Sequence, residues 1–232
     1  MAPHDHGFVH VSESEESWAE ETADEVLAAF ERVETPAITF CLSGGSTPGK
    51  VYDVLAKRTF EWERLRFYFG DERCVLPSSE QSNYRSAREH LFAPLGIEEK
   101  NIFRMKGEYD NRDEAALEYE AGLPEAFDLL LLGMGGDGHT ASLFPGSRWI
   151  KEVDRRVAPA KADVEPRQRL TITPPVIQSA REVMVLVTGS GKASMVARAL
   201  EGEWDPMEVP SQLARFRRWI LDPGAASALR ER

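Results

Sequence analysis

The first regular feature of the chain is a spacing of apolar and polar positions that predicts a helix over residues 13–32. Trp18, Val26 and Phe30 recur at helical intervals among many glutamates, as in an amphipathic helix with one buried face. A short apolar run over residues 37–42 then predicts a strand, and a helix is expected over 49–57 after a glycine-containing loop. The chain therefore begins with the order helix, strand, glycine loop, helix.

Short apolar runs continue to alternate with amphipathic segments along the rest of the chain. Strands are predicted at residues 65–69, 127–132, 170–173, 183–188 and 219–221. Helices are predicted at residues 81–92, 111–122, 174–180, 191–201 and 223–230. Strands joined by helical crossovers form mostly parallel sheets, so the prediction is an α/β fold, doubly wound, with helices on both faces of the sheet. Functional loops of such a sheet lie beyond the carboxyl ends of its strands.

Nothing in the chain marks a domain boundary. No polar, Gly/Ser-rich or charge-dense linker divides the 232 residues, and the sequence contains no internal repeat. With 42% hydrophobic residues the chain can bury the core of one α/β domain, so residues 1–232 are expected to form a single domain. Residues 148–167 are charged and irregular in pattern, and we expect them to form a rim or flap over the functional site.

Composition narrows the classes of function. The net charge of −11 disfavours a nucleic-acid or anionic-membrane partner, and an anionic substrate would need a local basic cluster. No stretch reaches about 18 apolar residues, so neither a transmembrane helix nor a signal peptide is expected. Cys41 and Cys74 lie in or beside apolar runs, which predicts reduced, packed thiols. We expect a soluble, cytoplasmic protein.

Histidines at the start of the chain raise the question of a metal site. His4, His6 and His10 have no neighbouring cysteine or carboxylate arrangement of recognisable geometry. A frayed terminus or an edge strand is the preferred interpretation, and no metal is expected.

The densest chemistry follows the predicted strand at residues 127–132. Glycines surround Asp137 and His139 there, and they free the backbone to adopt positive φ and to approach a ligand closely. His139 is the best candidate for a general base in the chain. The alternative is an ordinary glycine-rich turn whose aspartate caps a helix.

Two segments resemble nucleotide-binding loops, and both can be rejected. Gly133, Gly135 and Gly138 fit G-x-G-x-x-G, but Pro145-Gly146 interrupts the helix that would have to hold a pyrophosphate. Gly189-Ser-Gly-Lys-Ala-Ser194 ends like a P-loop, but Leu186 replaces the first glycine and Ala193 replaces the hydroxyl that binds Mg²⁺.

Three further loops after predicted strands carry polar chemistry. Ser43-Gly44-Gly45-Ser46, at a helix start, offers hydroxyls and free backbone N–H groups as a phosphate cradle, although a helix capped by Thr47 with Pro48 in first position is the alternative. Gly70-Asp-Glu-Arg73 places three charged residues after a strand, where a solvated turn is the alternative. Lys192 lies near a helix start, against the dipole preference, and a bound anion would resolve that conflict.

In these motifs the chain closely resembles the 6-phosphogluconolactonases, which are related to the glucosamine-6-phosphate deaminases. The resemblance spans nearly the whole chain. Its carriers are Leu42-Ser-Gly-Gly-Ser-Thr-Pro48, Gly70-Asp-Glu-Arg73, Ser82-Asn-Tyr84, Gly133-Met-Gly-Gly-Asp-Gly-His-Thr-Ala-Ser-Leu-Phe-Pro-Gly146, Arg169-Leu-Thr-Ile-Thr173 and Thr188-Gly-Ser-Gly-Lys192. It implies a Rossmann-like fold and hydrolysis of 6-phospho-D-glucono-1,5-lactone to 6-phosphogluconate in the oxidative pentose phosphate pathway, without an organic cofactor.

Three other functions fit these residues less well. A deaminase resembling the related family would have an Asn-Met-Asp-Glu-Tyr-like segment where this chain has Phe69-Gly-Asp-Glu-Arg73, and a glutamate after its Asp-Gly-His. A non-catalytic sugar-phosphate sensor would not need the intact pair of Asp137 and His139. A serine hydrolase would need a G-x-S-x-G elbow, which the sequence lacks.

The expected mechanism is direct hydrolysis with His139 as general base. Asp137 or Asp71 would orient the imidazole or stabilise the imidazolium, and the sequence leaves that choice open. The substrate-binding candidates are Ser43, Gly44, Gly45, Ser46, Arg73, Lys192 and Arg169. Oligomeric state and selectivity between the 1,5- and 1,4-lactones are left open as well.

Overall fold

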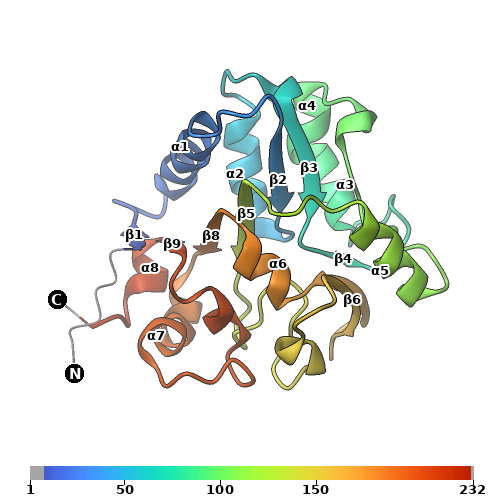
Figure 1. Cartoon of the computed structure of the whole chain (residues 1–232). Coiled ribbons are helices and arrows are strands. Elements are labelled where there is room, and N and C mark those ends of the chain that lie inside the picture. The colour runs from blue at the N-terminus through green and yellow to red at the C-terminus, as the bar shows by residue number, and fades with distance from the viewer. Residues whose placement is uncertain (1–7, 231–232) are drawn as a thin grey trace.

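A six-stranded parallel sheet forms the centre of the structure, a computed structural model that describes residues 8–230 (Figure 1). Its order is β1-β9-β8-β5-β2-β3, and every neighbouring pair is parallel. The strands are β1 (Val9–Val11), β2 (Ile38–Leu42), β3 (Leu65–Phe69), β5 (Leu129–Gly133), β8 (Glu182–Val187) and β9 (Arg218–Leu221). The order reverses direction between β2 and β5, which is the switch point where sheets of this kind place their ligands.

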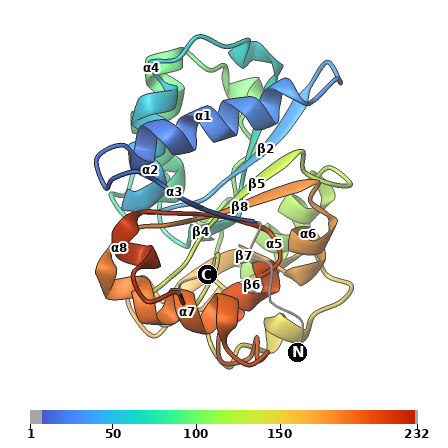
Figure 2. The same ribbon diagram turned by 90° about the vertical axis from the view of Figure 1, so that its left-hand side faces the viewer.

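Helices cover both faces of the sheet, as the sequence predicts. They are α1 (Trp18–Glu31), α2 (Ser46–Leu55), α3 (Asn83–Ala87), α4 (Ala93–Leu95), α5 (Arg112–Ala121), α6 (Pro174–Ser179), α7 (Ala193–Glu201) and α8 (Pro223–Ala226). Figure 2 shows α1 and α2 on one side of the sheet and α7 and α8 on the other. The predicted helix over 81–92 is present as α3 and a π-helical turn at Arg88–Phe92 that follows it directly. The predicted helix over 223–230 ends at Ala226.

The alternation of side chains along β5 explains why the sheet has two cores. Leu129 and Leu131 pack into the core under α1 and α2, whereas Leu130 and Leu132 pack into the core under α6 and α7. All four are at most 1% exposed. A strand buried on both faces is expected to be apolar throughout, which is why β5 is a plain run of leucines.

A second sheet of three antiparallel strands was not expected. It has the order β4-β7-β6, with β4 (Asp71–Arg73), β7 (Gln168–Ile172) and β6 (Val157–Lys161). The predicted strand at 170–173 therefore exists, but it pairs antiparallel with β4 and β6 instead of joining the parallel sheet. Asp71–Arg73 form a strand and not the solvated turn that was the alternative. Residues 148–167, whose sequence pattern is irregular, contain β6 and the 3-10 turn Arg148–Lys151.

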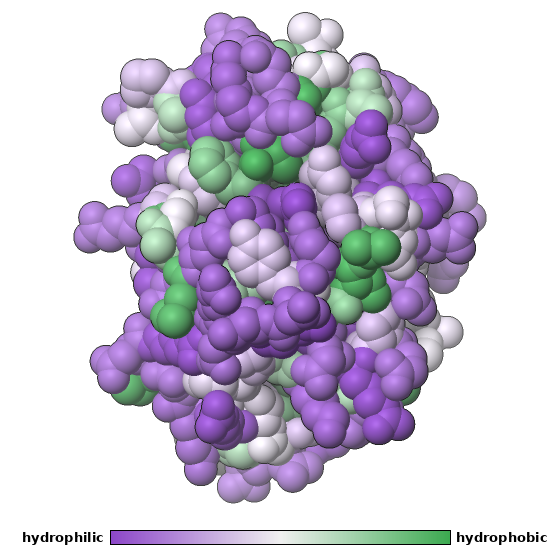
Figure 3. All heavy atoms as spheres, turned by 90° about the vertical axis from the view of Figure 1, so that its right-hand side faces the viewer, coloured by the Kyte–Doolittle hydropathy of each residue, from purple (hydrophilic) through white to green (hydrophobic). Residues whose placement is uncertain are grey.

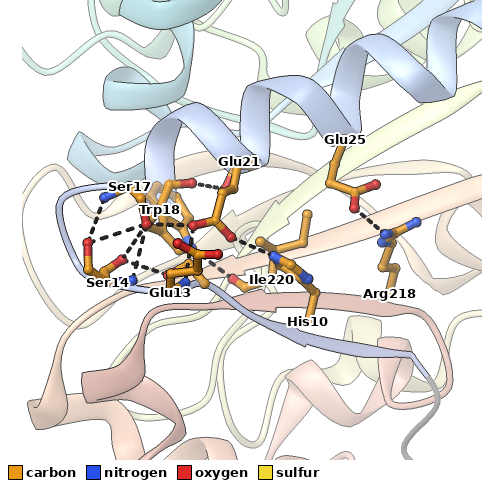
Figure 4. A network of polar contacts seen from close by, with 11 residues as sticks. His10, Glu13, Ser14, Ser17, Trp18, Glu21, Glu25, Arg218 and Ile220 are labelled. Carbon is orange, nitrogen blue, oxygen red and sulfur yellow. Dashed lines mark hydrogen bonds and ion pairs between the residues drawn. The ribbon is translucent and has the colours of Figure 1, made fainter.

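The short strand β1 pairs with β9, and polar contacts connect both strands to α1 (Figure 4). His10 Nε2 lies 3.0 Å from Glu21 Oε2, and Arg218 of β9 forms an ion pair with Glu25. His10 is thus part of an edge strand, while His4 and His6 lie outside the described residues. Within residues 8–230, no group of three or more His, Cys, Asp or Glu side chains is arranged to hold a metal ion.

The outer surface agrees with the polar composition. The face shown in Figure 3 is mostly hydrophilic, with small hydrophobic patches separated from one another. In the part of the chain that the structure describes, no helix is both long and apolar enough to cross a membrane. Cys41 and Cys74 are both free thiols, the first buried and the second half-buried, as predicted.

Candidate active site

All four loops singled out in the sequence meet at one cavity of about 250 Å³ beyond the carboxyl ends of β2, β5 and β8. The switch point between β2 and β5 lies at its centre. Its lining consists of Ser43, Gly44, Gly45, Ser46, Thr47, Pro48, Asp71, Arg73, Asn83, Gly133, Met134, Gly135, His139, Ala141, Leu186 and Lys192. No described residue between 148 and 167 contributes to this lining, so the expected flap over the site is absent from it.

His139 is held by Asp137 and not by Asp71. Its Nδ1 lies 2.6 Å from Asp137 Oδ1, and its backbone N–H donates to the same oxygen at 3.1 Å. With Nδ1 carrying the proton to a carboxylate, Nε2 is left as the unprotonated nitrogen, which is the tautomer that a general base requires. The hydrogen bond from His139 keeps the pKa of Asp137 below its ordinary value, so the carboxylate stays ionised.

A tight turn brings these two side chains together. Gly138 has a φ of 86°, and Gly135 exchanges backbone hydrogen bonds with His139 and Gly138. A Cβ atom on Gly135 would lie 2.1 Å from His139 Nδ1 and 2.6 Å from Asp137 Oδ1. The glycines therefore make room for the His–Asp pair, and no helix follows them within residues 134–147, which confirms that the loop is not a dinucleotide-binding turn.

Asp71 projects into the cavity from the start of β4 with both oxygens fixed. Oδ2 accepts a hydrogen bond of 2.6 Å from the Ser142 hydroxyl, and Oδ1 accepts one of 3.0 Å from Asn83 Nδ2. Asn83 itself packs so closely on Gly44 that a Cβ there would lie 2.1 Å from its amide oxygen. Asp71 is thus a fixed acceptor for a substrate hydroxyl or a water.

Behind Asp71, the carboxylate of Glu72 organises the segment that carries Asn83. Glu72 is 4% exposed and accepts hydrogen bonds from the backbone N–H groups of Arg73, Asn83 and Tyr84 and from the Ser82 hydroxyl. Burial raises its pKa against the opposing effect of these hydrogen bonds. Asn83 and Glu72 belong to motifs that carry the family resemblance, but neither is among the site residues predicted from the sequence. The only available signal was their place in those motifs.

The Ser43–Ser46 loop ends at a helix start with free N–H groups. Gly45 has a φ of 105° and precedes α2, whose first residue is Ser46 and which has no side-chain cap. The alternative of a helix capped by Thr47 was wrong, because the Thr47 hydroxyl instead lies 3.2 Å from that of Thr188. Unpaired N–H groups at the start of a helix of this length attract an anion.

Two basic side chains line the cavity beside this helix start. Arg73 donates to Gln81 O at 2.7 Å, and Lys192 Nζ donates to Met134 O at 2.5 Å. Burial lowers the pKa of the Lys192 ammonium. Lys192 immediately precedes α7, as expected from the sequence.

Arg169 lies beside the cavity without lining it. It is the cross-strand partner of Arg73 and is 6% exposed. Its Nε and Nη1 atoms are buried without a hydrogen-bond partner among the described residues. Burial, followed by the nearby charge of Arg73, lowers its pKa. Buried, unpaired guanidinium nitrogens next to a second arginine are the arrangement that a bound oxyanion would complete.

One non-glycine residue at the cavity has a strained backbone. Ala141 has a φ of 47°, and it follows Thr140, whose hydroxyl donates to Gly133 O at 2.9 Å. This strained turn connects His139 to Ser142, whose hydroxyl donates a hydrogen bond to Asp71. The sequence offered no signal for this conformation.

Comparisons with known proteins identify the family of this chain. The family model described as "Glucosamine-6-phosphate isomerases/6-phosphogluconolactonase" matches residues 13–220. A 6-phosphogluconolactonase of Synechocystis sp. is 37% identical over 205 residues, which are 83% of this chain and 85% of that protein. One of Mycobacterium tuberculosis is 38% identical over 186 residues, 73% of this chain and 75% of that protein.

Solved structures show the same fold. The 6-phosphogluconolactonase of Trypanosoma brucei matches with a TM-score of 0.83 at 27% identity, covering 96% of this chain and 98% of that one. A monomeric glucosamine-6-phosphate deaminase, 20% identical, shares the fold with a TM-score of 0.82. On the family match over most of its length and on relatives of this similarity, the chain belongs to the family of glucosamine-6-phosphate isomerases and 6-phosphogluconolactonases.

Proposed function

We propose that this chain hydrolyses 6-phospho-D-glucono-1,5-lactone to 6-phosphogluconate in the oxidative pentose phosphate pathway. The observation that carries the proposal is the hydrogen bond of 2.6 Å between Asp137 and His139 at a cavity that also contains Arg73, Lys192 and a helix start. A base beside an anion-binding edge suits a phosphorylated, hydrolysable substrate. The curated relatives named 6-phosphogluconolactonase support the same substrate.

In the proposed mechanism, His139 Nε2 removes a proton from a water that attacks the lactone carbonyl. Asp137 stabilises the imidazolium that forms, since its carboxylate accepts the Nδ1 hydrogen bond. When the tetrahedral intermediate collapses, the bond between the carbonyl carbon and the ring oxygen breaks, and His139 returns the proton to that oxygen. The product is a carboxylic acid with a free hydroxyl, so no covalent enzyme intermediate is needed.

The phosphate of the substrate is assigned to the basic side of the cavity. The side chains of Arg73 and Lys192 would bind the phosphate oxygens. The Ser46 hydroxyl and the backbone N–H groups of Gly44 and Gly45, in the loop that begins at Ser43, would donate further hydrogen bonds to them. Arg169 would supply further charge from behind Arg73. Asp71 would accept a hydrogen bond from a ring hydroxyl, which orients the lactone toward His139.

The test follows 6-phosphogluconate formation from freshly made lactone through a coupled dehydrogenase, after subtraction of spontaneous hydrolysis. The wild-type protein is expected to accelerate the reaction, and His139→Ala is expected to lower kcat by about 10²–10⁴-fold while 6-phosphogluconate still binds. His90→Ala is the matched control, because that histidine contacts Asp53 outside the cavity. A His139→Ala variant with near wild-type kcat would remove His139 from the base role.

A deaminase is the less favoured function. Among the described residues that line the cavity, Asp71 is the only carboxylate, and the segment 140–146 supplies none. Glucosamine 6-phosphate is therefore expected to remain unreacted. A sugar-phosphate sensor would bind 6-phosphogluconate with neither reaction occurring. We also keep the cytoplasm as the proposed location, supported by the two free thiols.

A further inference from the structure

Two buried tyrosines make the same unusual contact with the ends of two neighbouring strands. The Tyr52 hydroxyl donates to Ser43 O at 2.8 Å and accepts from Ser43 N at 3.1 Å. The Tyr119 hydroxyl donates to Phe69 O at 3.1 Å and accepts from Phe69 N at 2.7 Å. In each pair, one side chain replaces both hydrogen bonds that a further strand would make to that residue.

The two contacts come from opposite faces of the sheet. Tyr52 lies on α2 and is part of the core under α1 and α2, whereas Tyr119 lies on α5 and is part of the other core. They are 2% and 7% exposed. The N–H and C=O groups of Ser43 and Phe69 have no partner strand in the described sheet. Ser43 follows the end of β2, and Phe69 belongs to β3, which is an edge strand.

Each contacted residue lies at the beginning of a loop of the proposed active site or directly before one. Ser43 opens the Ser43–Ser46 loop at the start of α2, and both residues line the cavity. Phe69 is followed by Gly70 and then by β4, whose Asp71 and Arg73 also line the cavity. We propose that Tyr52 and Tyr119 are positioning residues, whose hydroxyls fix the direction in which these two loops leave the sheet.

The expected effect of the two tyrosines on substrate binding rests on the proposed function. Their contacts with Ser43 and Phe69, and the loop directions that these contacts fix, do not depend on that function. The tyrosines act on loops assigned to substrate binding, and the pair of His139 and Asp137 belongs to a third loop, after β5. Loss of either hydroxyl should therefore weaken substrate binding more than it slows the chemical step. A purely structural role would lower the melting temperature without that selective change.

The experiment compares Tyr52→Phe and Tyr119→Phe with Tyr68→Phe. Tyr68 is the neighbour of Phe69 in β3, and its hydroxyl has no hydrogen-bond partner in the described chain, so it is a matched control. For the two test variants we expect KM for the lactone and the inhibition constant of 6-phosphogluconate to rise about tenfold, with kcat changed less than about threefold. Tyr68→Phe should keep wild-type values. A test variant with unchanged KM at a temperature where it is folded would overturn the proposal.

Amide exchange tests the contacts without any substrate. Tyr52→Phe should speed exchange in residues 43–47 and not in 69–73, and Tyr119→Phe should do the reverse. Exchange that is equal to wild type in both segments would overturn the proposal even if the enzyme is active. Faster local exchange in a protein that never hydrolyses the lactone would instead reject the proposed function and keep the positioning role.

The wild-type protein provides the measurement if a variant does not fold. Tyrosine labelled with ¹³C at the ring carbon that bears the hydroxyl shows a resolved isotope effect in mixed water and heavy water only when the hydroxyl proton exchanges slowly. Slow exchange is expected for Tyr52 and Tyr119, and fast exchange for Tyr84, which is half-buried but whose hydroxyl bonds to Glu99 in an exposed contact. Fast exchange at Tyr52 and Tyr119 would overturn the proposal.

Discussion

At the scale of single residues, Gly135 has no room for a side chain, because the His139 imidazole occupies that space. A Cβ at Gly135 would lie 2.1 Å from His139 Nδ1. Gly135→Ala is therefore expected to push His139 away from Asp137 and lower kcat by about 10²-fold or more, since the general base is misplaced. Gly136→Ala is the control, because its Cβ would meet nothing within 4 Å. Steady-state kinetics of both variants checks this, and equal kcat values would contradict it.

Lys192 gives the site a dependence on alkaline pH. Burial lowers the pKa of its ammonium from the ordinary value of 10.5, so its charge is lost at a lower pH than that of an exposed lysine. The affinity for 6-phosphogluconate should accordingly fall as the pH rises through this lowered pKa. Lys192→Arg should bind with little change up to higher pH, since arginine keeps its charge. Titration calorimetry between about pH 7 and 10 distinguishes the two profiles, and identical profiles would exclude Lys192 from the phosphate site.

At the scale of elements, the short strand β4 depends on Glu72 for its connection to α3. The carboxylate accepts hydrogen bonds from three backbone N–H groups and one hydroxyl. In Glu72→Gln, one carboxylate oxygen is replaced by an NH2 group, which cannot accept the hydrogen bonds made to that oxygen. This should destabilise the fold by about 1–3 kcal/mol. The free energy of unfolding in urea measures this loss.

A neighbouring glutamate provides the control for Glu72. Glu89 is exposed and pairs with Arg85 on the surface, so Glu89→Gln should change the free energy of unfolding by less than about 1 kcal/mol. Losses of equal size in the two variants would show that the buried contacts of Glu72 are not what stabilises β4.

At the scale of the whole molecule, polar contacts attach α1 to the edge of the parallel sheet (Figure 4). The Ser17 hydroxyl and His10 both lower the pKa of Glu21 below its ordinary 4.5, the hydroxyl more strongly. A carboxyl group with a lowered pKa in the folded state stabilises the fold above its unfolded pKa, and this stabilisation is lost as the pH falls through the folded value. The melting temperature should therefore fall less steeply below about pH 4.5 in Glu21→Gln than in the wild type.

The comparison variant for this acid transition lies on the same helix. Glu31 is exposed at the end of α1 and has no side-chain partner among the described residues. Glu31→Gln should keep the wild-type slope of melting temperature against pH. A wild-type slope in Glu21→Gln as well would show that the contacts of α1 do not contribute to acid unfolding.

Residue pattern was enough to predict the parallel sheet and the loops that carry its chemistry. A strand that is buried on both faces, such as β5, is apolar at every position, and a helix with one buried face, such as α1, has apolar residues at helical spacing. Both elements can therefore be predicted from local sequence. Parallel strands end at one edge of a sheet, which is why the sequence alone places Ser43, Asp71, His139 and Lys192 in one group. The single domain remains a prediction, as do the roles of the site residues.

Only the tertiary structure decided how those side chains pair. It paired His139 with Asp137 and made residues 71–73 and 157–161 strands of a second sheet. It also placed Asn83 in the cavity lining, and Glu72, Tyr52 and Tyr119 behind that lining. These contacts join residues as far apart as Ser142 and Asp71. Local periodicity reports which face of an element is buried, but a hydrogen bond between distant segments depends on where the packed elements bring their ends, which the sequence pattern does not contain.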